Sequence, residues 1–266
     1  MDVRTIVITG AAGRIGTILR DRLARPGRVL RLLDVVPLEP APGAEVLPPA
    51  SVTDAAALRR ALDGADAVIH LGGIPVEDTW ENLVAVNIDG TRALLEQARQ
   101  AGVTRVVLAS SNHAAGFVDR ADWPAGELPA DVPPRPDTYY GVSKAAMEAL
   151  GSLYASRFGM DVVCLRIGTC QDTPPDTRSL STWLSPDDMG RLAEAAVSAP
   201  SPGFRIVWGI SHNTRRWWSL AEGEAIGYHP ADDAEKYAGT VPVTAPDPTE
   251  TLIGGMFCNV PLGEPM

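Results

Sequence analysis

Short apolar runs rich in β-branched residues alternate with amphipathic helical stretches, and this alternation restricts the fold more than any other feature of the chain. Strands are predicted at Thr5–Thr9, Val29–Asp34, Ala67–Leu71, Arg105–Ser110, Asp161–Ile167 and Arg205–Trp208. Helices are predicted between them, at Arg14–Ala24, Asp54–Leu62, Val86–Ala101 and Tyr140–Phe158. Such alternation is typical of a parallel sheet with helices on both faces, and nearly continuous apolar strands fit burial on both sides. We therefore predict an α/β fold with a doubly wound parallel sheet.

Two later regions depart from this rhythm. Residues 111–137 form a long loop, rich in proline and acidic residues, directly after a buried strand. Loops of this length within a compact domain are usually functional. A helix is predicted to begin at Ser185-Pro186-Asp187-Asp188, with serine as N-cap, proline at the first position and acids beside the helix dipole. We interpret these four residues as structural, not as a catalytic carboxylate pair.

Composition narrows the classes of function. The chain has 266 residues, 45% hydrophobic and 21% charged, which suffices for a core without metals or disulfides. Its formal net charge of −10 and its lack of a basic run argue against a nucleic-acid partner, and an anionic substrate would need a local cation. Cys164, Cys170, Cys258 and the four histidines have no metal-ligand spacing, so no metal is expected. With no long apolar segment and no signal pattern, we expect a cytoplasmic protein without a membrane partner.

A glycine-rich turn, Thr9-Gly10-Ala11-Ala12-Gly13-Arg14-Ile15-Gly16, joins the first predicted strand to the first helix. Glycine permits a tight turn and the close approach of a pyrophosphate to the backbone. The helix N-terminus offers N–H groups and a positive dipole end to the phosphates. A glycine triplet can also be a plain strand-to-helix turn, but here the strand, the turn and the amphipathic helix occur together. The turn therefore predicts dinucleotide binding.

Asp34 ends the second strand, 18 residues beyond Gly16, near the spacing at which an acid accepts hydrogen bonds from the adenosine ribose. A carboxylate there repels a 2′-phosphate, and Val35 and Val36 supply no arginine to neutralise one. We predict NAD in preference to NADP; the alternative is an acid that only caps a strand end. The third strand ends at His70-Leu71-Gly72-Gly73, whose small residues let a cofactor lie close to the backbone. We assign His70 no role.

Tyr140 and Lys144 lie four residues apart at the start of a predicted helix and therefore share one face of it. A phenol has a reference pKa of about 10, too high for a general base near neutral pH, and a nearby ammonium lowers that pKa. Tyr140 could then take a hydroxyl proton as hydride leaves the same carbon for nicotinamide. Ser110 and Ser111 end the preceding strand, where at most one of them can point at this pair. Spacing alone does not choose between them.

Taken in order, the glycine turn, Asn87-Ile88-Asp89-Gly90-Thr91, Ser110-Ser111 and the Tyr140/Lys144 pair resemble the extended short-chain dehydrogenase/reductase superfamily. More narrowly, the chain resembles the uronate dehydrogenases in Ala109-Ser110-Ser111-Asn112-His113, Arg166-Ile167-Gly168-Thr169-Cys170 and Arg178-Ser179-Leu180-Ser181-Thr182-Trp183. The resemblance covers essentially the whole chain. It implies an oxidoreductase that oxidises the anomeric hydroxyl of D-galacturonate or D-glucuronate with NAD, giving the aldarolactone.

The resemblance also implies a set of site residues. Tyr140, Lys144 and Ser111 would be catalytic, with Tyr140 as the base. Cofactor contacts would come from Gly10, Gly13, Arg14, Ile15, Gly16, Asp34, Val52, Leu71, Gly72, Gly73, Asn87, Tyr140, Lys144 and Ile167. Substrate contacts would come from Pro75, Ser111, Asn112, His113, Tyr140, Thr169 and Arg178. Arg178 would hold the carboxylate, for which a planar guanidinium is better suited than an ammonium; Arg166 is the alternative clamp.

Three positions depart from the family pattern: Pro75 and Thr169 stand where the family has serines, and Ser51 replaces an acid near the adenine. The first two bear on which uronate is preferred. One alternative function is a nucleotide-sugar epimerase or dehydratase, which usually carries a larger C-terminal domain. The other is a non-catalytic NAD-sensing regulator, a class that has typically lost the Tyr/Lys pair.

We divide the chain by role at residue 167. Residues 1–167 are predicted to form an NAD-binding Rossmann domain that includes the catalytic helix. Residues 168–266 are predicted to be a small C-terminal substrate-binding region packed on the same domain, over the carboxyl edge of the sheet, where ligands bind in such folds. The expected partner is a small-molecule sugar acid. A homo-oligomer is compatible with the sequence, which does not indicate a number of subunits.

Overall fold

A seven-stranded parallel sheet forms the centre of the molecule. The structure is a computed structural model that describes residues 3–124, 127–242 and 248–266. The strand order is β3-β2-β1-β4-β5-β6-β9, and every neighbouring pair is parallel. The strands are β1 (Thr5–Thr9), β2 (Val29–Leu33), β3 (Ala44–Val46), β4 (Ala67–His70), β5 (Arg105–Ser111), β6 (Asp161–Ile167) and β9 (Phe204–Gly209). The order reverses between β1 and β4, which opens a crevice at their carboxyl ends. The predicted doubly wound sheet is confirmed.

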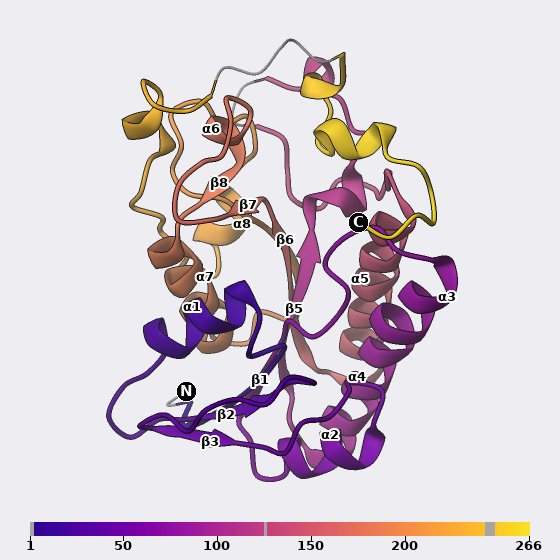
Figure 1. Ribbon diagram of the computed structural model, residues 1–266. Coiled ribbons are helices and arrows are strands. Elements are labelled where there is room, and N and C mark those ends of the chain that lie inside the picture. Colours follow the sequence, from indigo (N-terminus) through magenta and orange to yellow (C-terminus); the bar gives the residue numbers. More distant parts are fainter. Residues whose placement is uncertain (1–2, 125–126, 243–247) are drawn as a thin grey trace.

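Helices cover both faces of the sheet (Figure 1). On one side lie α1 (Arg14–Arg22) and α7 (Pro186–Ser198). On the other lie α2 (Ala55–Leu62), α4 (Gly90–Ala101) and α5 (Tyr139–Phe158). Successive side chains of β1 point to opposite faces of the sheet and so contribute to both hydrophobic cores. Ile6 and Ile8 belong to the core under α1 and α7, and Val7 belongs to the core under α2 and α4.

The ends of the helices follow their local sequence. The Asp54 carboxylate accepts hydrogen bonds from the N–H groups of Ala56 and Ala57 at the start of α2, and the Thr138 hydroxyl accepts one from Gly141 at the start of α5. Gly102 and Gly159 end α4 and α5 in the left-handed conformation, with φ of 76° and 67°. These caps explain why the bounds of α2 and α5 lie within one residue of the prediction.

The six predicted strands and the four predicted long helices are all present, but several short elements were missed, among them β3 and α3. β3 has only three partly exposed residues at the edge of the sheet, too few to give a periodic pattern. The helix predicted from Val86 is preceded by α3 (Trp80–Leu83) and begins within a π-helical segment, Val84–Asp89, before α4. Such π-helical segments often occur at functional sites, and this one contains Asn87.

The remaining elements are short and lie mostly near the carboxyl ends of the strands. They are β7 (Thr169–Cys170), β8 (Trp183–Leu184), α6 (Ser179–Thr182) and α8 (Ala221–Glu224), together with 3₁₀ turns η2 (Asn112–Ala115), η3 (Arg120–Asp122), η4 (Ala234–Tyr237), η5 (Pro248–Thr251) and η6 (Gly255–Asn259). In the part of the chain that the structure describes, no helix combines the length and apolarity needed to cross a membrane.

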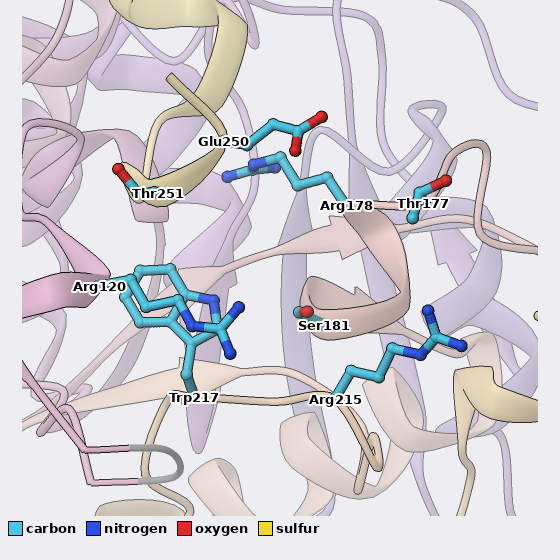
Figure 2. Close-up of a pocket in the computed structure, with 8 residues that line it drawn as sticks. All are labelled: Arg120, Thr177, Arg178, Ser181, Arg215, Trp217, Glu250 and Thr251. Atoms are coloured by element: carbon cyan, nitrogen blue, oxygen red, sulfur yellow. The ribbon is translucent and has the colours of Figure 1, made fainter. Parts of the chain in front are cut away.

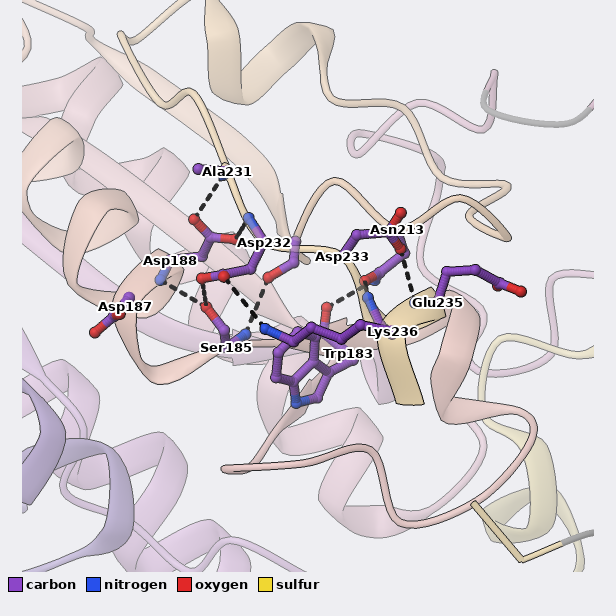
Figure 3. A network of polar contacts seen from close by, with 12 residues as sticks. Trp183, Ser185, Asp187, Asp188, Asn213, Ala231, Asp232, Asp233, Glu235 and Lys236 are labelled. Carbon is purple, nitrogen blue, oxygen red and sulfur yellow. Dashed lines mark hydrogen bonds and ion pairs between the residues drawn. The ribbon is translucent and has the colours of Figure 1, made fainter. Parts of the chain in front are cut away.

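Residues after 167 contribute to the same sheet and core. β9 pairs with β6, and α7 packs against α1. The predicted start of α7 is confirmed, since the Ser185 hydroxyl accepts the N–H of Asp188 at 2.9 Å. Asp188 is fully buried and accepts hydrogen bonds from the N–H groups of Ala231 and Asp232. These bonds hold the chain after β9 against the start of α7 (Figure 3). The division at residue 167 therefore remains a proposal about roles.

Candidate active site

The glycine turn packs directly against the loop that follows β4. Gly10 has a φ of +70°, and a Cβ on it would lie 2.7 Å from backbone atoms of Leu71 and Gly72. A Cβ on Gly16 would lie 2.4 Å from the carbonyl oxygen of Gly10. Gly13 is the N-cap of α1, and no side chain caps this helix end. The N–H groups of the first turn therefore face a glycine surface that fits a pyrophosphate.

Asp34 is held beside this turn by two backbone groups. Its carboxylate oxygens accept the N–H of Ala12 at 2.8 Å and the N–H of Val36 at 3.0 Å. The side chain is half-buried, and Val35 and Val36 beside it are exposed. A carboxylate oriented in this way has lone pairs left for ribose hydroxyls and repels a phosphate. The residues present therefore fit NAD.

The loop after β4 is held by Asn87. The Asn87 amide donates to the carbonyl of Ile74 at 3.0 Å and to the Ser143 hydroxyl at 2.9 Å, and its oxygen accepts the N–H of Ile74 at 2.8 Å. Asn87, expected as a cofactor contact, thus uses its polar atoms within the protein and shapes the loop that carries Gly72 and Gly73.

His70 has a structural position behind this loop. Burial lowers the pKa of His70 to about 3, so the ring is neutral near neutral pH. Its Nδ1 lies 2.8 Å from the hydroxyl of Thr9, which also accepts the N–H of Gly72 at 3.1 Å. The ring therefore joins β1 to the loop after β4.

Tyr140 and Lys144 lie on the first two turns of α5, next to the end of β5. The Lys144 ammonium donates to the carbonyl of Ala109 at 2.8 Å and lies 5.4 Å from the centre of the Tyr140 ring. The Ser111 side chain hydrogen-bonds with Tyr140. Ser110 points to the opposite side of the strand and donates to Glu148 at 2.6 Å. The structure thus places Ser111, not Ser110, beside the tyrosine.

The expected direction of the Tyr140 pKa shift is wrong for the protein alone. Burial raises the pKa of Tyr140 to about 12, and this outweighs the lowering by the hydrogen bond with Ser111. Burial also lowers the pKa of Lys144 to about 8, although the charge of Glu148 acts in the opposite direction. Because both groups are buried, desolvation of their charged forms exceeds the attraction between them.

The residues expected to bind the sugar acid gather where β5, α5 and the C-terminal segment meet. Asn112 and Arg178 both donate to the carbonyl oxygen of Ile253, Asn112 at 3.0 Å. His113 lies 5.8 Å from Tyr140, measured between ring centres. Its Nδ1 is 2.6 Å from a carboxylate oxygen of Asp137. Tyr140, Ser111, Asn112 and His113 therefore form one cluster, and Arg178 joins it through the shared carbonyl.

The other predicted residues lie around this cluster. Thr169, in β7, shares a 2.9 Å hydrogen bond with the Thr182 hydroxyl, and Pro75 is exposed on the loop after β4. Val52 packs under the loop, since a Cβ on Gly72 would lie 2.7 Å from its side chain. Arg14 is exposed and Ile15 half-buried at the start of α1, and Ile167 is buried at the end of β6.

Comparisons with known proteins show the family to which the chain belongs. Residues 6–170 match the NAD dependent epimerase/dehydratase family. The uronate dehydrogenase of Agrobacterium fabrum is 40% identical over 265 residues, which cover 98% of each chain. That of Pseudomonas putida is 38% identical over 257 residues, which cover 95% of this chain and 94% of that protein. The chain belongs to the uronate dehydrogenase family.

The structural comparison extends this relationship to the fold. A crystal structure of a mutant uronate dehydrogenase from Agrobacterium tumefaciens, complexed with NAD, matches with a TM-score of 0.88 at 39% identity. The match covers 97% of this chain and 98% of that chain. The similarity therefore includes the C-terminal segments as well as the dinucleotide-binding half.

Within this uronate dehydrogenase fold, Arg166 is unavailable as a carboxylate clamp. It is fully buried and donates to both carboxylate oxygens of Glu148 at 2.8 Å. A third hydrogen bond reaches the carbonyl of Val132 at 3.0 Å. Arg178 is only half-buried, and burial lowers the pKa of its guanidinium. A partly desolvated guanidinium gains most from an anionic partner, so Arg178 is the better clamp.

The sequence did not reveal two buried acids of this uronate dehydrogenase site. Glu77 is fully buried and accepts the N–H of Tyr140 at 2.8 Å and that of Gly263 at 2.8 Å. Asp137, also buried, holds His113. Asp137 directly precedes the N-cap of the catalytic helix, a position that could have drawn attention to it. Glu77 lies in an irregular loop and gave no signal.

Proposed function

We propose that this protein oxidises the anomeric hydroxyl of a hexuronate, D-galacturonate or D-glucuronate, to the aldarolactone with NAD. The observation that carries the proposal is that Arg178 and Asn112 meet at the Ile253 carbonyl, while the chain neighbours of Asn112, Ser111 and His113, lie beside Tyr140. A guanidinium thus lies at one end of the site and a tyrosine with a serine partner at the other. This combination suits an alcohol that carries a carboxylate.

In this mechanism the protein positions one hydroxyl and removes its proton. Ser111 and Tyr140 hydrogen-bond to the anomeric hydroxyl, and Tyr140 accepts its proton. NAD, which the glycine turn and Asp34 would hold, would supply the acceptor for the hydride of the anomeric carbon. The anomeric carbon becomes the carbonyl carbon of the lactone, and the proton on Tyr140 passes to solvent.

Lys144 assists Tyr140 in two ways. Its ammonium, 5.4 Å from the ring centre, stabilises the phenolate, and its hydrogen bond to Ala109 fixes the ammonium in place. Because burial and the charge of Asp137 raise the pKa of Tyr140 to about 12, a positive charge is needed beside it for proton removal near neutral pH.

The sugar acid is held by residues from several loops. We assign Asn112, His113 and Thr169 to its hydroxyl groups and Arg178 to its carboxylate. His113 is oriented by Asp137, which leaves Nε2 for the sugar. Pro75 lacks a hydroxyl, so at this position the loop after β4 makes only a van der Waals contact with the sugar and no side-chain hydrogen bond. The remaining proposed contacts, Gly10 to Gly16, Asp34, Val52, Leu71 to Gly73, Asn87 and Ile167, surround the cofactor.

The two alternative functions are less well supported. An epimerase or dehydratase acting on nucleotide sugars needs space for a nucleotide, whereas the chain spans nearly the full length of uronate dehydrogenases. The intact Tyr140, Lys144 and Ser111 set argues against a non-catalytic regulator.

We also propose that the enzyme acts in the cytoplasm, where NAD is abundant and its three free cysteines stay reduced. Its partner there is the small-molecule sugar acid, and a homo-oligomer remains compatible with the chain.

The proposal is tested by following NADH formation with galacturonate, glucuronate, the neutral parent sugars and UDP-sugars. Uronates should be oxidised far faster than the others. Tyr140→Phe should lower kcat by roughly 10²–10⁴-fold, as expected for the loss of a general base, and leave NADH binding intact.

Arg178→Ala should lower kcat/KM for uronates by roughly ten- to a hundredfold and barely change the slow turnover of neutral sugars. If uronate kinetics were unaffected by Arg178→Ala, the clamp would be misassigned.

A further inference from the structure

A pocket that Arg178 lines is formed mainly by residues without a role in the proposed sugar site. Its volume is about 420 Å³, within the range of small-molecule sites. Four separate segments line it: Arg120 comes from η3, Arg178 from the start of α6, Arg215 and Trp217 from the chain after β9, and Thr251 from η5 (Figure 2). Tyr140 and Ser111 do not line it, so this pocket is distinct from the site of proton removal.

The pocket is rich in guanidinium groups. Arg120, Arg178 and Arg215 line it together with one carboxylate, Glu250. Arg215 is paired with Glu235 at 2.7 and 2.8 Å. The side chain of Arg120 is exposed and has no hydrogen bond or ion pair with any residue that the structure describes. In a protein of net charge −10, an unpaired guanidinium in a concave surface provides the chemistry for binding an anion.

Arg178 connects this pocket to the proposed substrate site. It lines the pocket, and it shares the Ile253 carbonyl with Asn112 of the substrate cluster. In a pyranose, C1 and C4 lie at opposite ends of the ring, and the carboxylate of a hexuronate is carried by C5, next to C4. A sugar with C1 at Tyr140 and its carboxylate at Arg178 therefore directs the oxygen on C4 towards the pocket.

We propose that this pocket binds a second uronate unit attached to C4 of the substrate. The enzyme then oxidises the reducing end of 4-linked acidic disaccharides as well as free hexuronates. Arg120 binds the second carboxylate, and the Thr177 and Ser181 hydroxyls at the pocket wall meet its sugar hydroxyls. The reaction at C1 is unchanged: the hydroxyl loses a proton, C1 gives its hydride to NAD, and the glycosidic bond stays intact. The inference rests on the proposed function.

The experiment compares galacturonate with 4-linked digalacturonate by initial rates of NADH formation. Mass spectrometry identifies the product as the lactone of the intact disaccharide. We expect digalacturonate to be oxidised with a kcat/KM within about tenfold of that of galacturonate. Arg120→Ala should lower kcat/KM for digalacturonate by about five- to tenfold, as expected for loss of one partly exposed ion pair, and change that for galacturonate less than twofold. Arg135→Ala, an exposed arginine of the same loop outside the pocket, is the matched control and should change neither.

The outcomes separate the two proposals. If galacturonate is oxidised and digalacturonate is not, the pocket inference is wrong and the proposed function stands. If neither is oxidised, the proposed function fails. If digalacturonate is oxidised equally well by Arg120→Ala, the second unit lies outside this pocket. Methyl galacturonoside, which has no free anomeric hydroxyl, tests for a separate anion site: non-competitive inhibition that Arg120→Ala abolishes would overturn the disaccharide inference.

Discussion

At the scale of single residues, the proposed catalytic pair, Tyr140 and Lys144, combines two buried groups that burial disfavours in their charged forms. The pKa of Lys144 is lowered from 10.5 to about 8, which corresponds to about 3 kcal/mol of unfavourable free energy for the charged amine. In the proposed mechanism the ammonium is needed beside Tyr140, so Lys144 lowers the stability of the folded protein in favour of the reaction.

Lys144→Met should abolish turnover and increase the free energy of unfolding at pH 7 by about 1–3 kcal/mol, less than the full pKa cost because the hydrogen bond to Ala109 is lost. The unfolded chain holds more protons than the folded protein between pH 8 and 10.5. The wild type should therefore gain stability as pH rises through this window, and its deficit relative to Lys144→Met should shrink. Urea unfolding of both proteins at several pH values measures this. A deficit that is independent of pH would contradict it.

Asp137 acts on two site residues. It is 2.6 Å from His113, and its negative charge raises the pKa of Tyr140. Asp137→Asn keeps the shape but removes the charge. We expect KM for uronate to rise roughly tenfold because His113 loses a charged hydrogen bond. The pH profile of kcat should move to lower pH, because without this charge the Tyr140 phenol ionises more readily. An increase in KM with an unchanged profile would indicate a purely structural role.

Sequence predicted some of these residues and not others, for physical reasons. Tyr140 and Lys144 follow from spacing along one helix, and Asp34 from its distance to the glycine turn. Ser111 could not be separated from Ser110 because both side chains contact α5: Ser110 donates to Glu148, and Ser111 lies beside Tyr140 at the start of the helix. Glu77 and Asp137 act through contacts between segments that are far apart in sequence, which no local pattern encodes.

At the scale of elements, the sheet and its long helices were predictable because each carries a strong local signal. Apolar strands, amphipathic helices and N-caps such as Ser185 all agreed with the fold. β3, α3 and the π-helical segment at Val84–Asp89 were not predictable, because the conformation of such short or irregular elements is set by tertiary contacts. The same holds for the chain after β9, whose position depends on side chains such as Asp188.

Asp188 fastens that chain to the start of α7 (Figure 3). It is fully buried and accepts the N–H groups of Ala231 and Asp232 at 2.9 and 3.0 Å. Asp188→Ala would leave these donors without an acceptor, so the free energy of unfolding should fall by about 2–4 kcal/mol. Thermal unfolding measures this loss. Asp187→Ala, one residue earlier and exposed, is the control and should cost less than about 1 kcal/mol. Equal effects of both would contradict the assignment.

At the scale of the whole molecule, the proposed site has two ends built from different parts of the chain. The cofactor end comes from the loops after β1, β2 and β4. The sugar end comes from the loop after β5, the segment around α6 and residues 252–263. Phe257 lies 4.2 Å from His113 between ring centres, and Gly263 donates to Glu77, which in turn accepts the N–H of Tyr140. The C-terminal segment therefore contacts the proposed sugar end and has no assigned part in cofactor binding.

Removing residues 256–266 should therefore separate the two functions. The Ile253 carbonyl remains, but His113 loses its contact with Phe257, and Glu77 loses a backbone donor. We expect KM for uronate to rise at least about tenfold, from the loss of one ring contact and one charged hydrogen bond, while NADH binding measured by fluorescence stays within about twofold. Asp34→Ala is the complementary control: it should weaken NAD binding and narrow the preference for NAD over NADP while changing KM for uronate little. If the truncation weakened NADH binding as much as uronate binding, the C-terminal segment would support the whole fold and not only the sugar end.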